Sequence, residues 1–389
     1  MTEFLANSVD QASVICYVIA LLGCLYALFA IVAVRGFARS TIPATIEQFP
    51  PVTILKPLHG FEPDLYAHLA SFCMQNYPGP VQIVFGVTDP TDPAAAVVRK
   101  LIADFPDRDL VLVISPRRHG PNAKVSNLIN VQHEARHELL VISDSDIAVP
   151  GDYLKVVTAS LNQPGVGLVT CLYRGAAAAG TWSRLAAAAI DYHFLPNVLV
   201  GLKLGLARPC FGSTIAITKT TLAKLGGLQS VADQLADDYR LGIAVRRAGL
   251  KVTIPNFVVT HACAERSARA LLVHEIRWAR TIRSVDPLGF AGLAVTHAFP
   301  FALLGLILGG FTPAAVLVPA ALACRYALQG ELRRFFQVGD EFFWLGPIRD
   351  LLSFVVFIAS FFGRGVEWRG RRYGVRADNT LARYGEAES

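Results

Sequence analysis

Two aspartates that flank a single serine carry the strongest chemical signal in this sequence. Asp144 and Asp146 lie in the run ISDSDI at 142–147, directly after an apolar segment. In extended backbone, residues i and i+2 point the same way, so both carboxylates can face one point. Such hard oxygen ligands suit Mg²⁺ or Mn²⁺ that bridges a diphosphate, which makes both residues candidate metal ligands and Asp144 a candidate nucleotide contact. The alternative is a loop that uses its aspartates to cap turns.

Two further aspartates, Asp89 and Asp92, follow the apolar run at 81–87 in the sequence VTDPTDPA. A carboxylate at this position could bind the base or the ribose of a nucleotide. Asp92 also directly precedes Pro93, which is the pattern of a helix N-cap followed by proline in the first turn. The two functions of Asp92 are compatible with each other.

Lys56 and Lys124 are candidate contacts for the same nucleotide. Lys56 lies in ILKPLHG, at the end of an apolar run, and Lys124 lies in NAKVSN. We expect a helix to start near Ser126, so the Lys124 ammonium and the N-terminus of that helix could meet phosphate oxygens. Taken separately, each lysine is more typical of an exposed surface cation.

Asp238 is a candidate general base. It follows Asp237 in the sequence ADDY, after a glycine-containing loop. A carboxylate there could deprotonate an acceptor hydroxyl. The alternative is an acidic pair that opens a helix and is stabilised by the helix dipole.

Arg277 and Trp278, in HEIRW, share an expected helix with Arg280 and Arg283. The arginines could neutralise a leaving diphosphate, and the indole offers a flat surface for a sugar or a lipid. The alternative is an amphipathic helix at a membrane surface with an aromatic anchor. We interpret His261 and His274 as ordinary polar residues rather than metal ligands.

Short β-rich runs at 52–55, 81–87, 110–114 and 139–143 recur about every 29 residues. This is the spacing of βα units that build a parallel sheet, with one helix opening at Pro63 and a second running from Pro93 to about Asp104. Ligands bind at the carboxyl ends of parallel strands, where the candidate residues lie. The pattern predicts an α/β fold with a Rossmann-like nucleotide-binding layer.

Apolar runs flank this part of the chain. The first, at 12–34, has 23 residues without a charge, which is about 35 Å of helix and enough to span a bilayer. It is too long for a cleavable signal peptide, and Arg35 and Arg39 after it predict a cytoplasmic location for the following domain. Charge-free runs at 288–309 and 311–324 and another at 351–362 form a hairpin or separate passes. We expect a multi-pass protein of the cell (inner) membrane.

These patterns predict four regions: a membrane anchor at 1–39, a cytoplasmic catalytic domain at 40–287, membrane segments at 288–363 and a basic tail at 364–389. Only 17% of the 389 residues are charged and 53% are hydrophobic, which excludes an ordinary soluble enzyme with about 25% charged residues. The tail carries six arginines and two acids between 364 and 383. This charge suits binding to an anionic lipid surface better than binding to nucleic acid. The alternative is a solvated basic tail without a partner. The seven cysteines have no metal-finger spacing, so we expect reduced thiols.

As a set, the motifs resemble the ceramide glucosyltransferase family, which is glycosyltransferase family 21 with an inverting mechanism and a GT-A fold. They are LKPLHGFEPDL, DPTDPA, NAKVSNL, SDSD, PCFGS, ADDY and WRGRRYG. The resemblance implies a GT-A catalytic domain flanked by membrane helices, a UDP-sugar donor, a divalent cation and a lipid hydroxyl as acceptor. It maps the three aspartates of the family onto Asp92, Asp144 and Asp238, with Asp238 as the base. Arg277 and Trp278 then close the site, and His274 stands where the family has Gln or Arg.

The wording VSNLIN, DQLADDY and AIDYHFLP also resembles bacterial relatives that add N-acetylglucosamine to the hopanoid bacteriohopanetetrol. We therefore expect transfer of N-acetylglucosamine or glucose to a lipid, with the hopanoid favoured over ceramide. A processive polysaccharide synthase needs more membrane helices than the apolar length provides. A non-catalytic nucleotide-binding anchor would not need every expected carboxylate, yet all of them are present. A transporter would carry charges within its spans, and the first apolar run has none.

Overall fold

The computed structural model describes residues 2–40, 48–309, 311–339, 343–363, 365–368, 371–375 and 380–383. The chain divides into two compact units, neither of which is continuous in sequence. The helical unit comprises Met1–Arg39, Gly180–Ala207 and Glu265–Arg364, and the sheet unit comprises Ser40–Ala179, Arg208–Ala264 and Gly365–Ser389. The four regions expected from the sequence stay a prediction.

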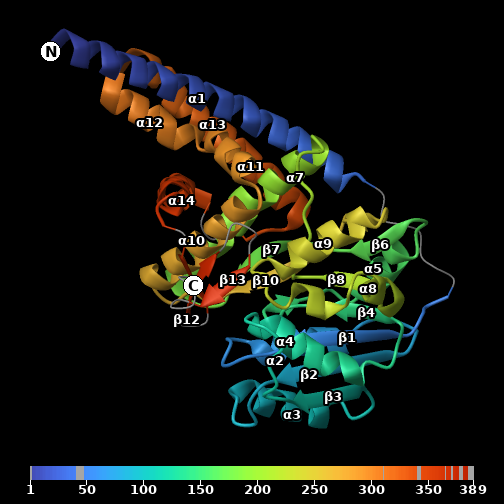
Figure 1. Ribbon diagram of the computed structural model, residues 1–389. Coiled ribbons are helices and arrows are strands. Elements are labelled where there is room, and N and C mark those ends of the chain that lie inside the picture. Colours follow the sequence, from blue (N-terminus) through green and yellow to red (C-terminus); the bar gives the residue numbers. More distant parts are fainter. Residues whose placement is uncertain are drawn as a thin grey trace. The chain divides into compact units, whose positions relative to one another are not determined.

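The sheet unit is built on a seven-stranded sheet with the strand order β3-β2-β1-β4-β8-β6-β9 (Figure 1). The first four strands of that order run parallel, and β8 is antiparallel to β4. The four predicted strands are confirmed, and the fold is the expected α/β class. The strands are β1 Val52–Pro57, β2 Val81–Val87, β3 Asp109–Ile114, β4 Leu139–Ile142, β6 Val166–Val169, β8 Ile215–Thr218 and β9 Lys251–Thr253.

The predicted crossover helices are present as α2 (Leu65–Cys73) and α3 (Pro93–Asp104). The next helix, α4 (Ala123–Val131), begins three residues before the expected Ser126. Its start is fixed by Asn122, whose side chain accepts a hydrogen bond from the Val125 amide, as an N-cap residue does. The expected helix start was therefore wrong, and Lys124 lies inside the first turn.

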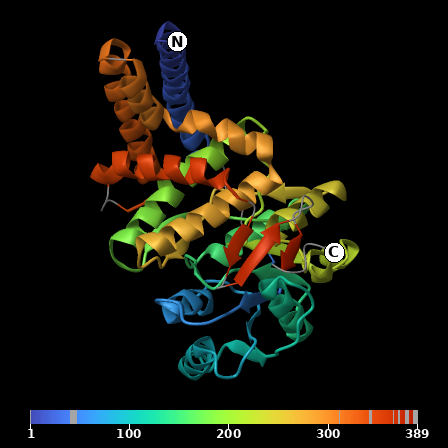
Figure 2. The same cartoon turned by 60° about the vertical axis from the view of Figure 1, so that its left-hand side comes forward.

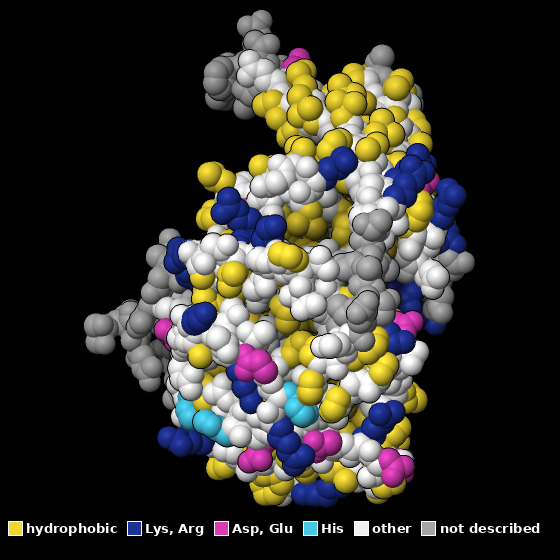
Figure 3. Space-filling model, turned by 90° about the vertical axis from the view of Figure 1, so that its right-hand side faces the viewer, with side chains coloured by type: hydrophobic (Ala, Val, Ile, Leu, Met, Phe, Trp, Pro, Cys, Tyr) yellow, Lys and Arg dark blue, Asp and Glu magenta, His cyan; other side chains and the backbone are white. Residues whose placement is uncertain are grey.

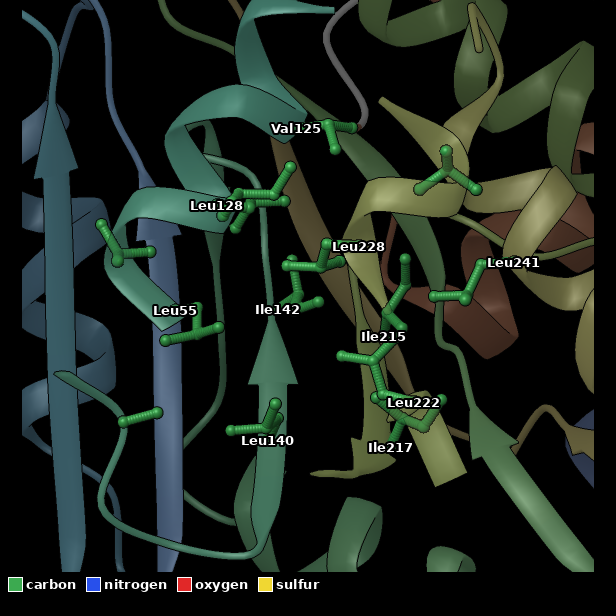
Figure 4. Close-up of a cluster of buried hydrophobic side chains, with 14 of the residues drawn as sticks. Leu55, Val125, Leu128, Leu140, Ile142, Ile215, Ile217, Leu222, Leu228 and Leu241 are labelled. Atoms are coloured by element: carbon green, nitrogen blue, oxygen red, sulfur yellow. The ribbon is translucent and has the colours of Figure 1, made fainter. Parts of the chain in front are cut away.

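A buried apolar cluster joins the sheet to the helices that cover it (Figure 4). Leu55 of β1, Ile142 of β4 and Ile215 of β8 contribute from the strands. Leu128 contributes from α4 and Leu241 from α9 (Asp237–Arg247). Because the strands and helices that end near the candidate site share this core, their ends are held in fixed register.

Two smaller sheets complete the sheet unit. In the first, β10 (Val258–Cys263) pairs antiparallel with β5 (Ile147–Ala148) and parallel with β7 (Leu172–Ala177). The second is antiparallel and is formed by β11 (Gly365–Trp368), β12 (Arg371–Val375) and β13 (Leu381–Arg383), drawn in red in Figure 2. The side chains of the six tail arginines lie outside the described residues, so the lipid-surface expectation stays a prediction. Helices α5 (Tyr153–Leu161) and α8 (Lys219–Lys224) also belong to this unit.

In the helical unit, α1 (Thr2–Ala38) lies along α12 (Ala298–Gly309) and α13 (Phe311–Phe336), as Figures 1 and 2 show. A π-helical turn at Ile190–Phe194 joins α6 (Gly180–Ala189) to α7 (Leu195–Lys203). The remaining helices are α10 (Ala268–Val285), α11 (Pro287–Gly292) and α14 (Gly346–Ser360). Among the described residues, which include all seven cysteines, no disulfide is formed.

Among the described residues, three helical segments are long and apolar enough to cross a membrane: Asp10–Ala38, Gly180–Lys203 and Phe343–Ser360. A fourth candidate, Pro287–Thr296 with Ala298–Gly309, is bent by 68°, so the expected 288–309 run is not one straight helix. Hydrophobic side chains gather on the exposed surface of the helical unit (Figure 3), and on α1 they are Val14, Ile15, Val18, Leu21, Leu22, Leu25, Leu28 and Val32. This is the surface expected of a membrane protein.

Candidate active site

Several predicted residues of the sheet unit lie at the ends of β1, β2 and β4 or in the loops that follow them. These strands are parallel neighbours, so the residues that follow them lie along one edge of the sheet. Because β8 is antiparallel to β4, the loop before β8 reaches the same edge, and the amide of Asp144 donates a hydrogen bond to the Gly212 carbonyl at 3.2 Å. The topology thus places Gly212, the glycine of the PCFGS motif, beside the turn that carries Asp144 and Asp146, which is called the acidic turn below.

Lys124 lies between the acidic turn and the start of α9. Its Nζ is 2.7 Å from Asp144 Oδ1 and 3.5 Å from Asp237 Oδ2. Burial alone would lower the pKa of Lys124, but Asp144, Asp237 and Asp238 outweigh burial and raise the pKa above its ordinary value. Asn122 also donates to Asp237 Oδ1 at 3.2 Å. Lys124 is therefore a half-buried, charged link between two acidic segments, and not an exposed surface cation.

Asp238 lies in the first turn of α9, so the expected helix-opening acidic pair is confirmed. One carboxylate oxygen accepts from the Gly212 amide at 2.8 Å, and the other accepts from the Tyr239 amide at 2.7 Å. Burial, together with the neighbouring Asp237, raises the pKa of Asp238 to about 6. A carboxylate with this pKa is ionised at neutral pH and is still a stronger base than an exposed aspartate.

Asp146 pairs with a histidine that the sequence analysis had interpreted as an ordinary polar residue. Its Oδ2 is 3.2 Å from Nε2 of His261 on β10, and its carbonyl accepts from the Ala262 amide at 2.8 Å. Burial would lower the pKa of His261, but the Asp146 carboxylate outweighs it and holds that pKa well above the ordinary value. His261 therefore orients one of the two expected metal ligands.

Lys56 is hydrogen-bonded to the backbone of the acidic turn. Its side chain is fully buried, and Nζ donates to the carbonyl of Asp144 and lies 3.3 Å from Ser143 Oγ. The ammonium is also 4.0 Å from the centroid of the Phe72 ring. Burial lowers the pKa of Lys56 to about 7, although Asp146 and Asp144 oppose that shift. The lysine holds the backbone of the turn, which differs from the surface position that is typical of a lone lysine.

Asp92 is the predicted N-cap of α3, accepting from the Ala94 amide at 2.9 Å. Both of its oxygens also accept from the Gly60 amide, each at 2.9 Å. The residue therefore ties the loop after β1 to the loop after β2. Asp89 is exposed and accepts from the hydroxyl and the amide of Thr91, which lowers its pKa.

The acidic turn has the carboxylate oxygens that a divalent cation requires. Within the part of the chain that the structure describes, no group of three or more His, Cys, Asp or Glu side chains is arranged to hold a metal ion. Mg²⁺ and Mn²⁺ are commonly held by one or two carboxylates together with substrate phosphates. Asp144 and Asp146, whose side chains are 33% and 37% exposed, provide such a pair. The residues present therefore fit a cation that the donor substrate helps to hold.

Gly212 provides the close approach on which this arrangement depends. A Cβ on this residue would lie 2.5 Å from Asp144 Oδ2 and 2.8 Å from Lys124 Nζ. Both atoms are ends of side chains, so a Gly212→Ala variant displaces them without breaking the backbone. We expect it to fold normally and to bind a nucleotide donor more weakly, which isothermal titration with UDP and Mn²⁺ would measure. Gly151→Ala is the matched control, because a Cβ there meets nothing within 4 Å; equal affinities for the two variants would contradict the expectation.

Arg277 and Trp278 lie in the helical unit, on α10. On the same helix, Arg280 donates to the carbonyl of Phe362, and Arg283 Nη2 donates to the carbonyl of Gly363 at 3.0 Å. These carbonyls follow the end of α14, where arginines commonly satisfy unpaired acceptors. Arg280 and Arg283 therefore have a structural task, which the sequence pattern alone did not reveal.

Comparisons with known proteins find the same family as the sequence motifs. A family model described as glycosyl transferase family 21 matches residues 15–381. A ceramide glucosyltransferase of Candida albicans is 36% identical over 28% of this chain and 22% of its own length. Ceramide glucosyltransferase 1 of Caenorhabditis elegans is 28% identical over 56% of this chain and 46% of its own length. The chain thus matches less than half the length of these curated relatives.

A solved structure supports the fold. The mannosyltransferase PcManGT of Pyrobaculum calidifontis, in complex with GDP-mannose and Mn²⁺, aligns with a TM-score of 0.53 and 19% identity. The alignment covers 90% of this chain and 99% of that chain. At this identity the likeness establishes the shared GT-A fold, as the β-strand spacing and the motifs predicted.

Proposed function

We propose that this chain, which belongs to glycosyltransferase family 21, transfers a sugar from a UDP-sugar to the hydroxyl group of a membrane lipid. It is a glycosyltransferase of the GT-A fold. The observation that carries the proposal is the convergence of Asp144, Asp146 and Asp238 at one sheet edge, linked through Lys124 and Gly212. That edge provides separate acidic groups for a cation and for a general base.

In the proposed reaction, Asp238 accepts the proton of the lipid hydroxyl while the hydroxyl oxygen attacks the anomeric carbon. The bond from that carbon to the UDP oxygen breaks on the opposite face, which inverts the configuration. The pKa of Asp238, about 6, leaves it deprotonated and ready to accept this proton at neutral pH. The amides of Gly212 and Tyr239 hold the carboxylate in place.

The remaining groups are proposed to hold the donor. A divalent cation at Asp144 and Asp146 would offset the charge that develops on the UDP leaving group. Lys124, in the first turn of α4, is proposed to contact the phosphates. Asp89 and Asp92, which follow β2, are proposed to contact the ribose or the base. Lys56 acts through the backbone of the acidic turn. Arg277 and Trp278 are proposed to serve the transfer step.

The lipid acceptor is proposed from two features. Curated relatives are ceramide glucosyltransferases, and the part of the chain that the structure describes has three helical segments long and apolar enough to cross a membrane. Helices that cross the bilayer would keep the enzyme at the surface where the lipid hydroxyl lies. We propose bacteriohopanetetrol with UDP-N-acetylglucosamine as the first pair, from the VSNLIN, DQLADDY and AIDYHFLP resemblance, and ceramide with UDP-glucose as the second. The proposed location is the cell membrane, with the site facing the cytoplasm.

The test is a matrix of donors and acceptors. Detergent-solubilised protein with Mn²⁺ or Mg²⁺ is given UDP-glucose, UDP-N-acetylglucosamine or UDP-galactose, each with ceramide or bacteriohopanetetrol. Products are identified by mass spectrometry. A glycosylated hopanoid would support the first pair, and glucosylceramide would support the second. Binding of UDP without any lipid product would contradict both acceptors.

A further inference from the structure

His274 contacts Trp278, one of the two residues of α10 that are proposed to serve the transfer step. It lies four residues before Trp278 on the helix, so both side chains lie on one helix face. The ring centroids are 4.6 Å apart and the planes meet at 78°, which is an edge-to-face arrangement. At this distance the imidazole limits the positions that the indole can take.

The other side of the imidazole is anchored. His274 Nδ1 is hydrogen-bonded to Glu265 Oε1, which lies in the segment that leads into α10. Glu265 is only 7% exposed, and its side chain is therefore held by its surroundings. A histidine with one nitrogen fixed by a carboxylate has a fixed ring orientation, as histidines supported in this way at metal sites do.

The helix itself is fixed as well. The buried Arg349 of α14 donates two hydrogen bonds to Glu275, the neighbour of His274. Nη1 donates to Oε1 and Nη2 donates to Oε2, each at 2.7 Å. Arg349 Nη1 also donates to the carbonyl of Leu185 on α6 at 3.1 Å. Such a bidentate pair fixes orientation as well as distance. Figure 1 shows α10 and α14 as neighbours in this unit.

We propose that His274, held by Glu265, is a positioning residue that fixes the indole of Trp278 for the transfer step. The inference rests on the proposed function of Trp278. It also gives a physical role to the position where the family resemblance has Gln or Arg. All three side chains can donate a hydrogen bond to the Glu265 carboxylate, but only histidine adds an aromatic edge against Trp278.

The experiment uses the full-length protein labelled with 5-fluorotryptophan, in which the four tryptophans give ¹⁹F resonances. The Trp278 resonance is assigned by its loss in Trp278→Phe. We expect His274→Ala and Glu265→Gln to shift or broaden this resonance alone and to lower kcat about 10- to 100-fold, with KM for the donor unchanged. His274→Gln keeps the hydrogen bond to Glu265 and should recover part of kcat.

His133→Ala is the matched control, because His133 is an exposed histidine of the sheet unit. A Trp278 resonance that is unmoved in His274→Ala, or an unchanged kcat, would overturn the proposal. A purely structural role would instead lower the thermal midpoint and leave kcat per folded molecule unchanged. Should wild-type protein transfer no sugar at all, the proposed function fails and this role in transfer fails with it. The resonance then reports the contact alone, which distinguishes the two failures.

Discussion

Replacing Asp238 with Asn should reduce sugar transfer by about 100- to 10,000-fold, which is the usual contribution of a general base. The amide cannot accept the proton of the acceptor hydroxyl, but it is nearly the same size as the carboxylate. Binding of UDP should therefore change little, because the donor is proposed to be held by other residues. The measurement is the initial rate of product formation, paired with the Kd of UDP.

The pH dependence of the wild-type rate provides an independent check of the same assignment. The raised pKa of Asp238, about 6, means that the carboxylate becomes protonated as the pH falls through 6. The rate should then be constant at neutral pH and fall tenfold per pH unit well below 6. An ordinary aspartate, with a pKa of about 3.9, would keep the rate constant to much lower pH. Any residual activity of Asp238→Asn should lack this acid limb.

Asp233→Asn is the matched control, because Asp233 is an exposed aspartate five residues earlier. It should keep the wild-type rate and the wild-type pH profile. If Asp238→Asn turns over normally, the base lies elsewhere, and Asp237 would be the next residue to change. Its carboxylate is already engaged by Lys124 and Asn122.

The parts of the fold that depend on local pattern were predictable. The runs that became β1, β2, β3 and β4 are short and apolar, and their regular spacing predicts parallel βα units. The Asp92 cap was equally visible, since Asp followed by Pro is a local signal. The start of α4 is also encoded locally, by Asn122 as its N-cap, and the predicted start at Ser126 lies four residues after this cap.

The parts that depend on contacts between distant segments were not predictable. His261 pairs with Asp146 only because β10 lies beside β5, and these strands are more than 100 residues apart. Gly212 meets Asp144 because β8 runs antiparallel to β4. Sequence spacing along one element carries no information about these pairings.

The apolar helical segment Gly180–Lys203 is not visible in the sequence for a different reason, since Arg184 and Asp191 interrupt its apolar run.

The second large effect concerns the acidic turn, where Asp146→Ala should weaken the Mn²⁺-dependent binding of UDP at least about 10-fold, as losses at metal sites commonly do. The variant removes one of two carboxylates that are proposed to hold the cation. It also leaves the buried His261, whose positive charge Asp146 balances, without that partner. The measurement is the Kd of UDP titrated at increasing Mn²⁺ concentrations.

Asp107→Ala is the matched control, because Asp107 is exposed in a turn of the sheet unit. It should leave both the affinity for UDP and its dependence on Mn²⁺ unchanged. An unfolded Asp146→Ala protein would lose UDP binding with and without the cation, whereas a folded variant that lacks a ligand should lose only the part that depends on Mn²⁺. An unchanged Mn²⁺ dependence in a folded variant would move the cation away from Asp146. Asp144 would then act through its ion pair with Lys124, which also contacts Asp237 and so links α4 to α9.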